Sequence, residues 1–294
     1  MHFLGRIGGV AALAAVAVAA PTRLASRAVS SDVLGQLKLF AEYSAASYCT
    51  NNINSTGDAL SCDIGNCASV QSAETTTLWE FDRVCSYGNV AGFFAVDKTN
   101  ELLVLSFRGS RSVSTWIANI NTGLTDVSSL CSGCEAHAGF WESWETVADD
   151  VASQLKSAQS TYPGYKVVVT GHSFGGAVAA LASAALRNAG TSLELYTYGE
   201  PRLGNKALAT YTTEQGSLWR VTHTNDIVPR LPPTSFGFSH PSPEYWVTSG
   251  NSGTPTTSDV TVVEGIDSKS GNRGELLPSV SAHLWYFGDM SGCE

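Results

Sequence analysis

The sequence predicts an α/β fold in which a central, mostly parallel sheet is flanked by helices. Segments with the β-branched content of buried strands alternate along the chain with segments of helical spacing. The 294 residues are 43% apolar, which is enough to bury one large core. Residues 167–180 read VVVTGHSFGGAVAA, so a buried strand passes through a sharp turn directly into small, helix-compatible residues.

The N-terminal segment has the composition of a secretory signal peptide. The positively charged segment 1–6, which contains Arg6, precedes an apolar run at 7–20 that is shorter than the roughly 20 residues that span a bilayer. We therefore expect a signal peptide at 1–20, a short pro-segment at 21–29 and a single domain at 30–294. The mature protein is then secreted and extracellular, and it has no integral membrane segment.

Acidic residues outnumber basic ones, with 26 Asp and Glu against 17 Lys and Arg, so the formal net charge is −9. Removing Arg6, Arg23 and Arg27 with the leader leaves 14 basic side chains and a charge of about −12. No cluster of basic residues is present in the sequence to neutralise phosphates, so nucleic acid is excluded as an expected partner.

Secretion favours disulfides over metal sites for the cysteines. The C-x-x-C pair Cys131 and Cys134 has no second pair to complete a metal site, so we interpret it as a local disulfide, and we expect no metal or cofactor. The sequence Asn54-Ser55-Thr56 is a glycosylation sequon. The odd count leaves at least one thiol unpaired among Cys49, Cys62, Cys67, Cys85, Cys131, Cys134 and Cys293.

The remaining elements follow in chain order. Helical spacing predicts an amphipathic helix from Ser31 to near Cys49, followed by loops to about Leu78. Two apolar runs around a polar tetrapeptide predict a hairpin, and Tyr162-Pro163-Gly164 ends one long helix before the strand at 167. The predicted segments are hairpin strands 92–96 and 102–107, a long helix including 144–158, strand 193–198, helix 205–215, strand 218–222, and surface loops 250–258 and 268–278.

The pattern Gly171-His172-Ser173-Phe174-Gly175 is typical of the nucleophile elbow of α/β-hydrolases. The backbone of such an elbow bends so tightly that only glycine-sized neighbours avoid a clash. Ser173 would stand at the head of a helix, where free backbone N–H groups and the helix dipole favour an oxyanion. Ser173 is therefore the candidate nucleophile, and we interpret His172 as a packing residue.

A serine nucleophile needs a histidine base, and the base needs a carboxylate. In hydrolases of this architecture the chain order is serine, acid, histidine. His283, late in the chain and surrounded by aromatic residues, is preferred to the alternatives His223 and His240. Asp226 follows a predicted strand and is braced by three nearby prolines, so it is preferred to Asp259, Asp267 and Asp289.

The second oxyanion donor should come from the loop after an earlier strand, where Ser110 follows the run at 102–107. Beyond it, an apolar face at i, i+3, i+4 and i+7 predicts a short helix, which is either a core helix or a cover over the site. If it is a cover, opening it in water is costly and a lipid surface offsets that cost. The four apolar residues are Val113, Trp116, Ile117 and Ile120.

Several motifs occur in an order that resembles the secreted fungal triacylglycerol lipases of the Thermomyces lanuginosus and Rhizomucor miehei type. They are FAEYSAASYC, LSFRGSRSVSTWIANIN, CSGC, VVVTGHSFGGA, YGEPRLGN, THTNDIVPRLPP, SPEYW and AHLWYFG. The resemblance implies a Ser173, Asp226, His283 triad, an oxyanion hole from Ser110 and the N–H of Phe174, and a lid at 113–121. It also implies the disulfides Cys49 to Cys293, Cys62 to Cys67 and Cys131 to Cys134, with Cys85 free.

Two residues depart from the pattern of that family. Phe174 replaces the usual leucine after the nucleophile, which should alter the pocket wall. Glu200 replaces a usual alanine and places a carboxylate near a strand end, where the sequence indicates no role for it.

Taken together, the residues and the resemblance predict a lid-gated serine ester hydrolase. Its expected substrate is triacylglycerol at a lipid droplet or emulsion surface, and the oligomeric state stays open. The alternatives are an esterase for soluble or cell-wall esters of the feruloyl esterase kind, a broader phospholipase or galactolipase activity, and a lipid-binding protein without turnover.

Overall fold

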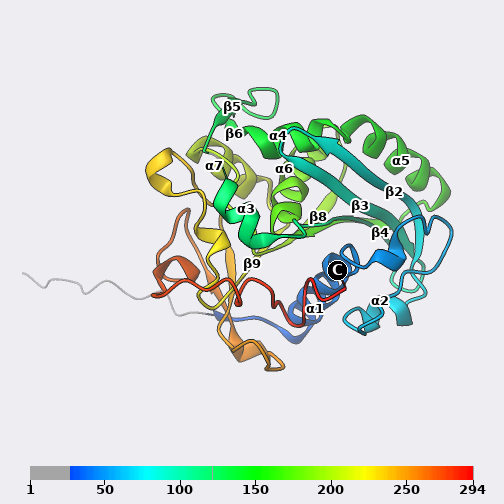
Figure 1. Ribbon diagram of the computed structural model, residues 1–294. Helices are drawn as coiled ribbons and strands as arrows, with labels where there is room; N and C mark the ends of the chain where they lie inside the picture. The colour runs from blue at the N-terminus through cyan, green and yellow to red at the C-terminus, as the bar shows by residue number, and fades with distance from the viewer. Residues whose placement is uncertain (1–26, 121, 294) are drawn as a thin grey trace, which may run out of the picture.

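The computed structural model describes residues 27–120 and 122–293 (Figure 1). The predicted signal peptide at 1–20 and the first part of the predicted pro-segment lie outside these residues. The strands are β1 (Arg27–Ala28), β2 (Thr76–Cys85), β3 (Gly88–Asp97), β4 (Leu102–Phe107), β5 (Leu124–Asp126), β6 (Glu135–His137), β7 (Lys166–His172), β8 (Leu193–Tyr198), β9 (Leu218–His223), β10 (Glu244–Val247) and β11 (Val260–Val263).

Nine of these strands form one sheet in the order β1-β11-β10-β9-β8-β7-β4-β3-β2. The five central strands β4, β7, β8, β9 and β10 are parallel, and an antiparallel pair closes each end. All six residues of β4 (LLVLSF) are buried, as expected for a strand covered on both faces. The predicted α/β fold with a mostly parallel sheet is therefore confirmed.

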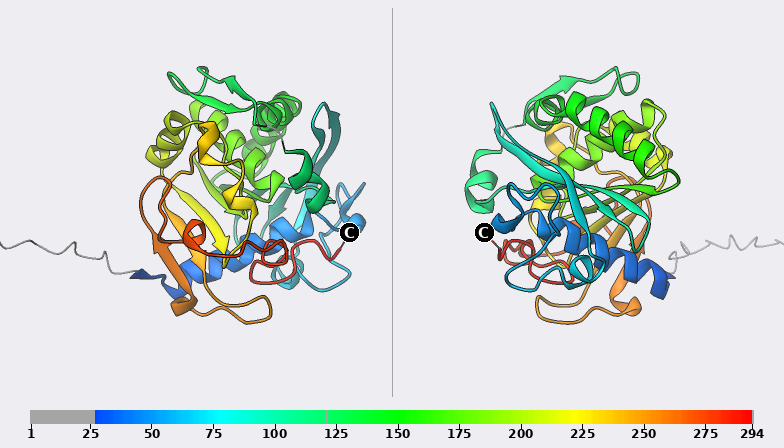
Figure 2. Two further views of the ribbon diagram at one scale, coloured as in Figure 1. Left: turned by 60° about the vertical axis from the view of Figure 1, so that its left-hand side comes forward. Right: turned by 90° about the vertical axis from the view of Figure 1, so that its right-hand side faces the viewer.

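Helices cover both faces of the sheet (Figures 1 and 2). Helix α1 packs against one face, and its N-terminus is capped by the hydroxyl of Ser30, which accepts a hydrogen bond from the Val33 N–H. Helices α4 to α7 contribute to the core on the other face. The α-helices are α1 (Ser31–Ala46), α2 (Ala68–Ser72), α3 (Val113–Asn119), α4 (Ala138–Glu145), α5 (Ala148–Thr161), α6 (Phe174–Asn188) and α7 (Lys206–Gln215).

The prediction of a single long helix before strand β7 is wrong. Two helices, α4 and α5, occupy this stretch, because the backbone leaves the helical region at Val147 (φ −121°, ψ −1°). The side chain of Val147 is buried, so it supports the core between the two helices, which the apolar spacing alone did not separate. Strand β2 also begins at Thr76, where a loop was expected; many of its residues are partly exposed, so it lacks a clean strand pattern.

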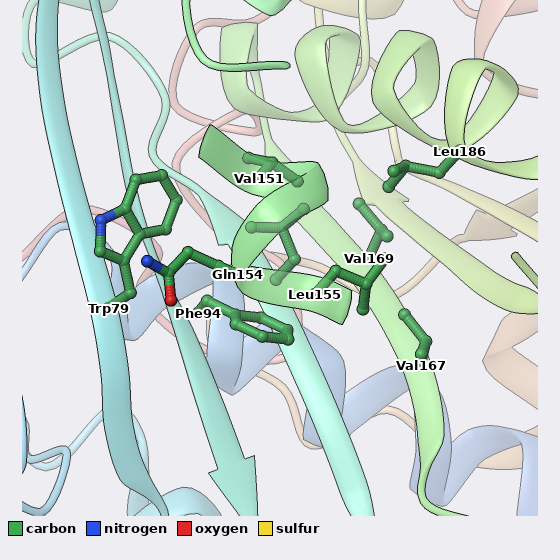
Figure 3. A pocket seen from close by; sticks show the side chains of 9 residues that line it. Trp79, Phe94, Val151, Gln154, Leu155, Val167, Val169 and Leu186 are labelled. Carbon is green, nitrogen blue, oxygen red and sulfur yellow. The ribbon is translucent and has the colours of Figure 1, made fainter. Parts of the chain in front are cut away.

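Helix α5 packs on the sheet through an apolar layer (Figure 3). Val151 and Leu155 of α5 meet Phe94 and Val169 of the sheet, and Gln154 is the one amide in this layer. The gap between them leaves essentially no room for a water molecule. This part of the molecule is therefore packed core and not a binding site.

Candidate active site

The predicted elbow lies between β7 and α6, with Ser173 at the turn. Ser173 has φ 58° and ψ −130°, a strained conformation for a residue with a side chain. A Cβ atom on Gly171 would lie 2.4 Å from the carbonyl oxygen of Gly175, and one on Gly175 would lie 2.2 Å from that of Phe107. The elbow therefore requires glycine at both positions, and Ser173 is held at the N-terminus of α6.

The structure brings Asp226 and His283 into direct contact, although 57 positions separate them in the chain. Nδ1 of His283 lies 2.8 Å from Oδ2 of Asp226, and both side chains are fully buried. The hydroxyl of Tyr286 donates to the same carboxylate oxygen at 2.5 Å, and the Val228 N–H donates to Oδ1 at 2.8 Å. Asp226 is therefore fixed by three donors.

Two polar atoms at the centre of this region have no hydrogen-bond partner among the described residues. They are Oγ of Ser173 and Nε2 of His283, and both atoms are buried. Buried polar atoms without partners are rare in folded proteins and call for an explanation. Here the unpartnered atoms are the two that a serine nucleophile and its base would use.

His172 supports the ring of His283 from behind, as the packing interpretation predicted. The two rings lie 4.4 Å apart, and Nε2 of His172 donates to the backbone carbonyl of His283 at 2.9 Å. Its Nδ1 then accepts the hydroxyl proton of Tyr48 at 2.7 Å. Burial and the neighbouring His283 lower the pKa of His172 well below 6.5, so it stays neutral and keeps these bonds.

Sequence reasoning missed Tyr286 and Gly199, which also shape the site. Gly199 has φ 58°, and a Cβ there would lie 2.7 Å from Cε1 of His283 and 3.1 Å from Oδ2 of Asp226. A side chain at this position would push the pair apart. The signals were present: Tyr286 follows His283 by three positions, and Gly199 lies in the YGEPRLGN motif.

The alternative bases and acids have structural partners elsewhere. His223 contacts the carbonyls of Ala282 and Ser249, and His240 contacts that of Pro229. The rival carboxylates accept backbone N–H groups in loops: Asp259 from Thr256, Asp267 from His240, and Asp289 from Ser291 and Gly292.

Ser110 and Phe174, the expected oxyanion residues, line one pocket of about 250 Å³. Trp116 of helix α3 and Ile120, the residue that follows this helix, border the same pocket. The helix ends at Asn119, so the predicted lid at 113–121 extends beyond it, and residue 121 lies outside the described residues. Of the four predicted lid residues, Val113 and Ile117 do not line this pocket.

The wall of this pocket is aromatic. The ring of Phe140 lies between Trp116 (6.3 Å, stacked) and Phe174 (5.9 Å, edge to face). The phenylalanine that departs from the usual leucine therefore extends an aromatic wall from the elbow toward α3. The pocket also includes the polar side chains of Thr115 and Asn119.

The cysteines pair as the resemblance implied. The structure has the disulfides Cys49–Cys293, Cys62–Cys67 and Cys131–Cys134, and Cys85 is free. The first of these connects the loop after α1 to the tail that follows His283.

Glu200, the second departure, lies just beyond β8 and is fully buried. Among the described residues, neither carboxylate oxygen has a hydrogen-bond donor of good geometry, although the Thr197 hydroxyl interacts with this carboxyl group. Burial raises its pKa to about 7, opposed by Thr197 and by the positive charge of Arg220. Its Cβ lies 3.5 Å from the position of a Cβ on Gly176, in the first turn of α6.

Comparisons with known proteins agree with this fold. Residues 104–236 match the family model for lipase (class 3), and residues 9–79 match the lipase 3 N-terminal region. The chain is 46% identical over 283 residues to secreted mono- and diacylglycerol lipase A of Penicillium camembertii, covering 95% of this chain and 92% of the relative. It is 34% identical over 273 residues to the lipase of Rhizomucor miehei, covering 90% and 72%.

Solved structures lead to the same family. A mutant form of the Penicillium cyclopium enzyme MDLA has a TM-score of 0.86 and 45% identity, covering 90% of this chain and 100% of that one. Lipase II from Rhizopus niveus has a TM-score of 0.79 and 30% identity, covering 91% and 99%. In the part of the chain that the structure describes, every helix is too short or too polar to cross a membrane. The chain belongs to the class 3 family of fungal lipases and is a carboxylic ester hydrolase.

Proposed function

We propose that this chain hydrolyses acylglycerols with Ser173 as nucleophile, His283 as general base and Asp226 as the carboxylate that orients it. One observation carries the proposal. The buried Asp226–His283 pair occurs together with an unpartnered Ser173 Oγ at a strained elbow and an unpartnered Nε2 on His283. That set of groups is what acyl transfer through a serine requires.

In the first half of the reaction, His283 Nε2 accepts the Ser173 hydroxyl proton as Oγ attacks the ester carbonyl. Asp226 stabilises the imidazolium that forms. The N–H of Phe174 and the Ser110 residue stabilise the developing oxyanion at the edge of the shared pocket. His283 then gives the proton to the departing alcohol oxygen, which leaves an acyl ester on Ser173. His283 Nε2 then takes a proton from water as the water oxygen attacks the acyl carbon. The acyl–Oγ bond breaks, Ser173 Oγ receives the proton from His283, and the fatty acid leaves.

Helix α3 acts as the lid in this proposal. Trp116 and Ile120 are partly buried and border the pocket that holds Ser110 and Phe174, so moving the helix would uncover both the pocket and apolar side chains. Exposing such side chains to water costs roughly 1.5–3 kcal/mol each. A lipid surface removes that cost, so opening is coupled to contact with the lipid.

The substrate is an acylglycerol, and the two candidates are triacylglycerol and the partial glycerides. The resemblance of the sequence motifs implied triacylglycerol. The relatives at 46% identity are named secreted mono- and diacylglycerol lipases, which favours partial glycerides as a second candidate. Their names also support an extracellular location for this chain.

The test is fatty-acid release from emulsified triolein, diolein and monoolein by the wild type and the Ser173→Ala variant. We expect the wild type to release fatty acid and the variant to lose that activity by several orders of magnitude. The ratio of rates among the three lipids decides between the two substrate candidates. Binding without release would instead indicate a lipid-binding protein.

Two further readouts separate the remaining alternatives. A lipase with a lid should show a jump in rate when the substrate passes its solubility limit, whereas smooth saturation favours an esterase for soluble esters. A phosphonate ester presented in detergent should label Ser173; an adduct on another residue would overturn the assignment of the nucleophile.

A further inference from the structure

Two neighbouring leucines on the segment before His283 are almost completely exposed. Leu276 is 82% and Leu277 is 84% exposed, and Val280 in the same segment is also exposed. By contrast, Ala282 and His283, only a few residues later, are buried. Single exposed apolar residues are ordinary, but an adjacent exposed pair beside a candidate catalytic histidine requires an account.

The segment is held tightly to the residues that flank Asp226. The side-chain amide of Asn225 donates to the Leu277 carbonyl at 2.7 Å, and Ser279 N donates to the Asn225 carbonyl at 2.9 Å. Ile227 N donates in turn to the Ser279 carbonyl at 3.2 Å. The leucines therefore lie on a loop that is hydrogen-bonded to the two residues flanking Asp226.

The backbone at Leu277 supports a role outside the core. Its φ is 54°, a left-handed conformation that a bulky side chain rarely adopts. The strain is not offset by packing, because the side chain is exposed. A leucine retained under strain and in water indicates a surface that becomes covered during function.

The charges near this loop indicate which kind of lipid surface it can contact. No lysine or arginine follows Arg273 to the end of the chain, whereas Glu275 adjoins the leucine pair. Arg273 itself is engaged by the Asp267 carbonyl and the Thr234 hydroxyl. With a net charge of −9 on the whole chain, this surface does not suit an anionic membrane. An uncharged lipid surface fits it.

We propose that Leu276 and Leu277 insert into the surface of neutral lipid droplets and anchor the enzyme there with its catalytic histidine loop toward the lipid. The proposal rests on the function proposed above and adds the surface that docks. Figure 1 shows this segment in orange and red, on the opposite side of the view from α2.

The experiment compares the wild type with a Leu276→Ser/Leu277→Asn double variant, since asparagine tolerates the left-handed backbone. Binding is measured by sedimentation with triolein emulsion, which is uncharged, and with phosphatidylglycerol vesicles, which are anionic. Hydrolysis is measured on the emulsion and on dissolved p-nitrophenyl acetate. Ile64→Ser is the matched control, because Ile64 is a half-exposed apolar residue in the Cys62–Cys67 loop near α2. Leu276→Met/Leu277→Met is the conservative variant.

The double variant should bind the emulsion about tenfold or more weakly per leucine removed, and its ratio of emulsion to dissolved-ester turnover should fall with binding. The control and the methionine variant should bind like the wild type. Unchanged emulsion binding by a folded double variant, or equally tight wild-type binding to the vesicles, would overturn the proposal. So would a wild-type dimer that dissociates on substitution, because the leucines would then be covered by a second copy. Absence of ester hydrolysis by the wild type on both substrates would instead refute the proposed function.

Discussion

Two carboxylates lie fully buried just beyond neighbouring strands, and their surroundings differ sharply. Asp226 follows β9 and accepts hydrogen bonds from His283, Tyr286 and the Val228 N–H. Glu200 follows β8, and neither of its oxygens meets a hydrogen-bond donor with acceptable geometry among the described residues. The two strands are paired with each other in the sheet, so the carboxylates differ in donors and not in depth.

The difference shows what a buried carboxylate needs in order to work as an anion. Removing a charge from water is costly unless donors replace the lost hydration. Two of the donors to Asp226 come from side chains 57 and 60 positions away, so the fold assembles the site around it. At Glu200 the Thr197 hydroxyl and the charge of Arg220 offset burial only in part, so burial raises its pKa to about 7. We therefore interpret Asp226 as a carboxylate whose donors stabilise its negative charge. We interpret Glu200 as a carboxyl group that destabilises the fold less when it is protonated.

Replacing each acid by its amide should give the largest difference in kcat between the two sites. Asp226→Asn should lower kcat by about 10⁴, because the amide can no longer hold the required tautomer of His283. Glu200→Gln is the matched control and should change kcat far less, since Glu200 makes no bond to the pair. Steady-state rates on a dissolved ester measure both. A comparable loss in both variants would mean that the contrast between the sites is wrong.

The next test concerns charge that forms only during the reaction. Ser110→Ala should lower kcat by about 10²–10³ if its hydroxyl stabilises the oxyanion, with little change in the free energy of unfolding. Ser112→Ala provides a control, because Ser112 lines the same pocket and its hydroxyl bonds Thr115. An unchanged rate in Ser110→Ala would remove the hydroxyl from the oxyanion hole.

The local parts of this architecture could be predicted from the sequence. The elbow depends on glycines within a few residues of Ser173, and strands β4 and β7 contain the continuous apolar runs LLVL and VVV. Strand β8 (LELYTY) carries Glu194 and Thr197 among its apolar residues, but its length and aromatic content still favour a strand. The contact between Asp226 and His283 also agrees with the expected order of serine, acid and histidine.

The parts that failed depend on tertiary contacts. The break between α4 and α5 occurs at a buried valine, which reads like any other residue of an apolar helix face. Strand β10 was not predicted because it is short and begins with Glu244, whose charge is paired inside the protein with Arg220 at 3.5 Å. The third donor to Asp226, Tyr286, shows no periodicity that distinguishes it from an ordinary core aromatic residue.

Glu200 should make stability depend on pH in a direction that can be worked out. In the unfolded chain its pKa is near 4.5, and in the folded protein it is about 7. Below pH 4.5 the group is protonated in both states and folding carries no penalty. As pH rises from 4.5 to 7 the unfolded chain ionises while the folded group keeps its proton, so up to about 3 kcal/mol of stability is lost, and the loss levels off once the folded group also ionises.

Glu200→Gln cannot ionise, so the difference in unfolding free energy between the variant and the wild type isolates this effect. That difference should move in favour of the variant between pH 4.5 and 8.5, as measured by denaturant midpoints. A difference that stays constant with pH would show that Glu200 has donors in solution and resembles Asp226 after all.

The smallest expected effect tests whether Asp226 is charged in the resting protein. Tyr286→Phe removes a hydrogen bond to its carboxylate, and Tyr198→Phe removes one to the neutral carbonyl of Leu37. Both tyrosines are fully buried and their rings lie 5.9 Å apart, so the two substitutions remove a hydroxyl from the same buried region. A bond to a charged group contributes about 1.5–3 kcal/mol and a neutral one about 0.5–1.5 kcal/mol. Urea unfolding at pH 7 should therefore show the larger loss for Tyr286→Phe, whereas equal losses would argue against a charged Asp226.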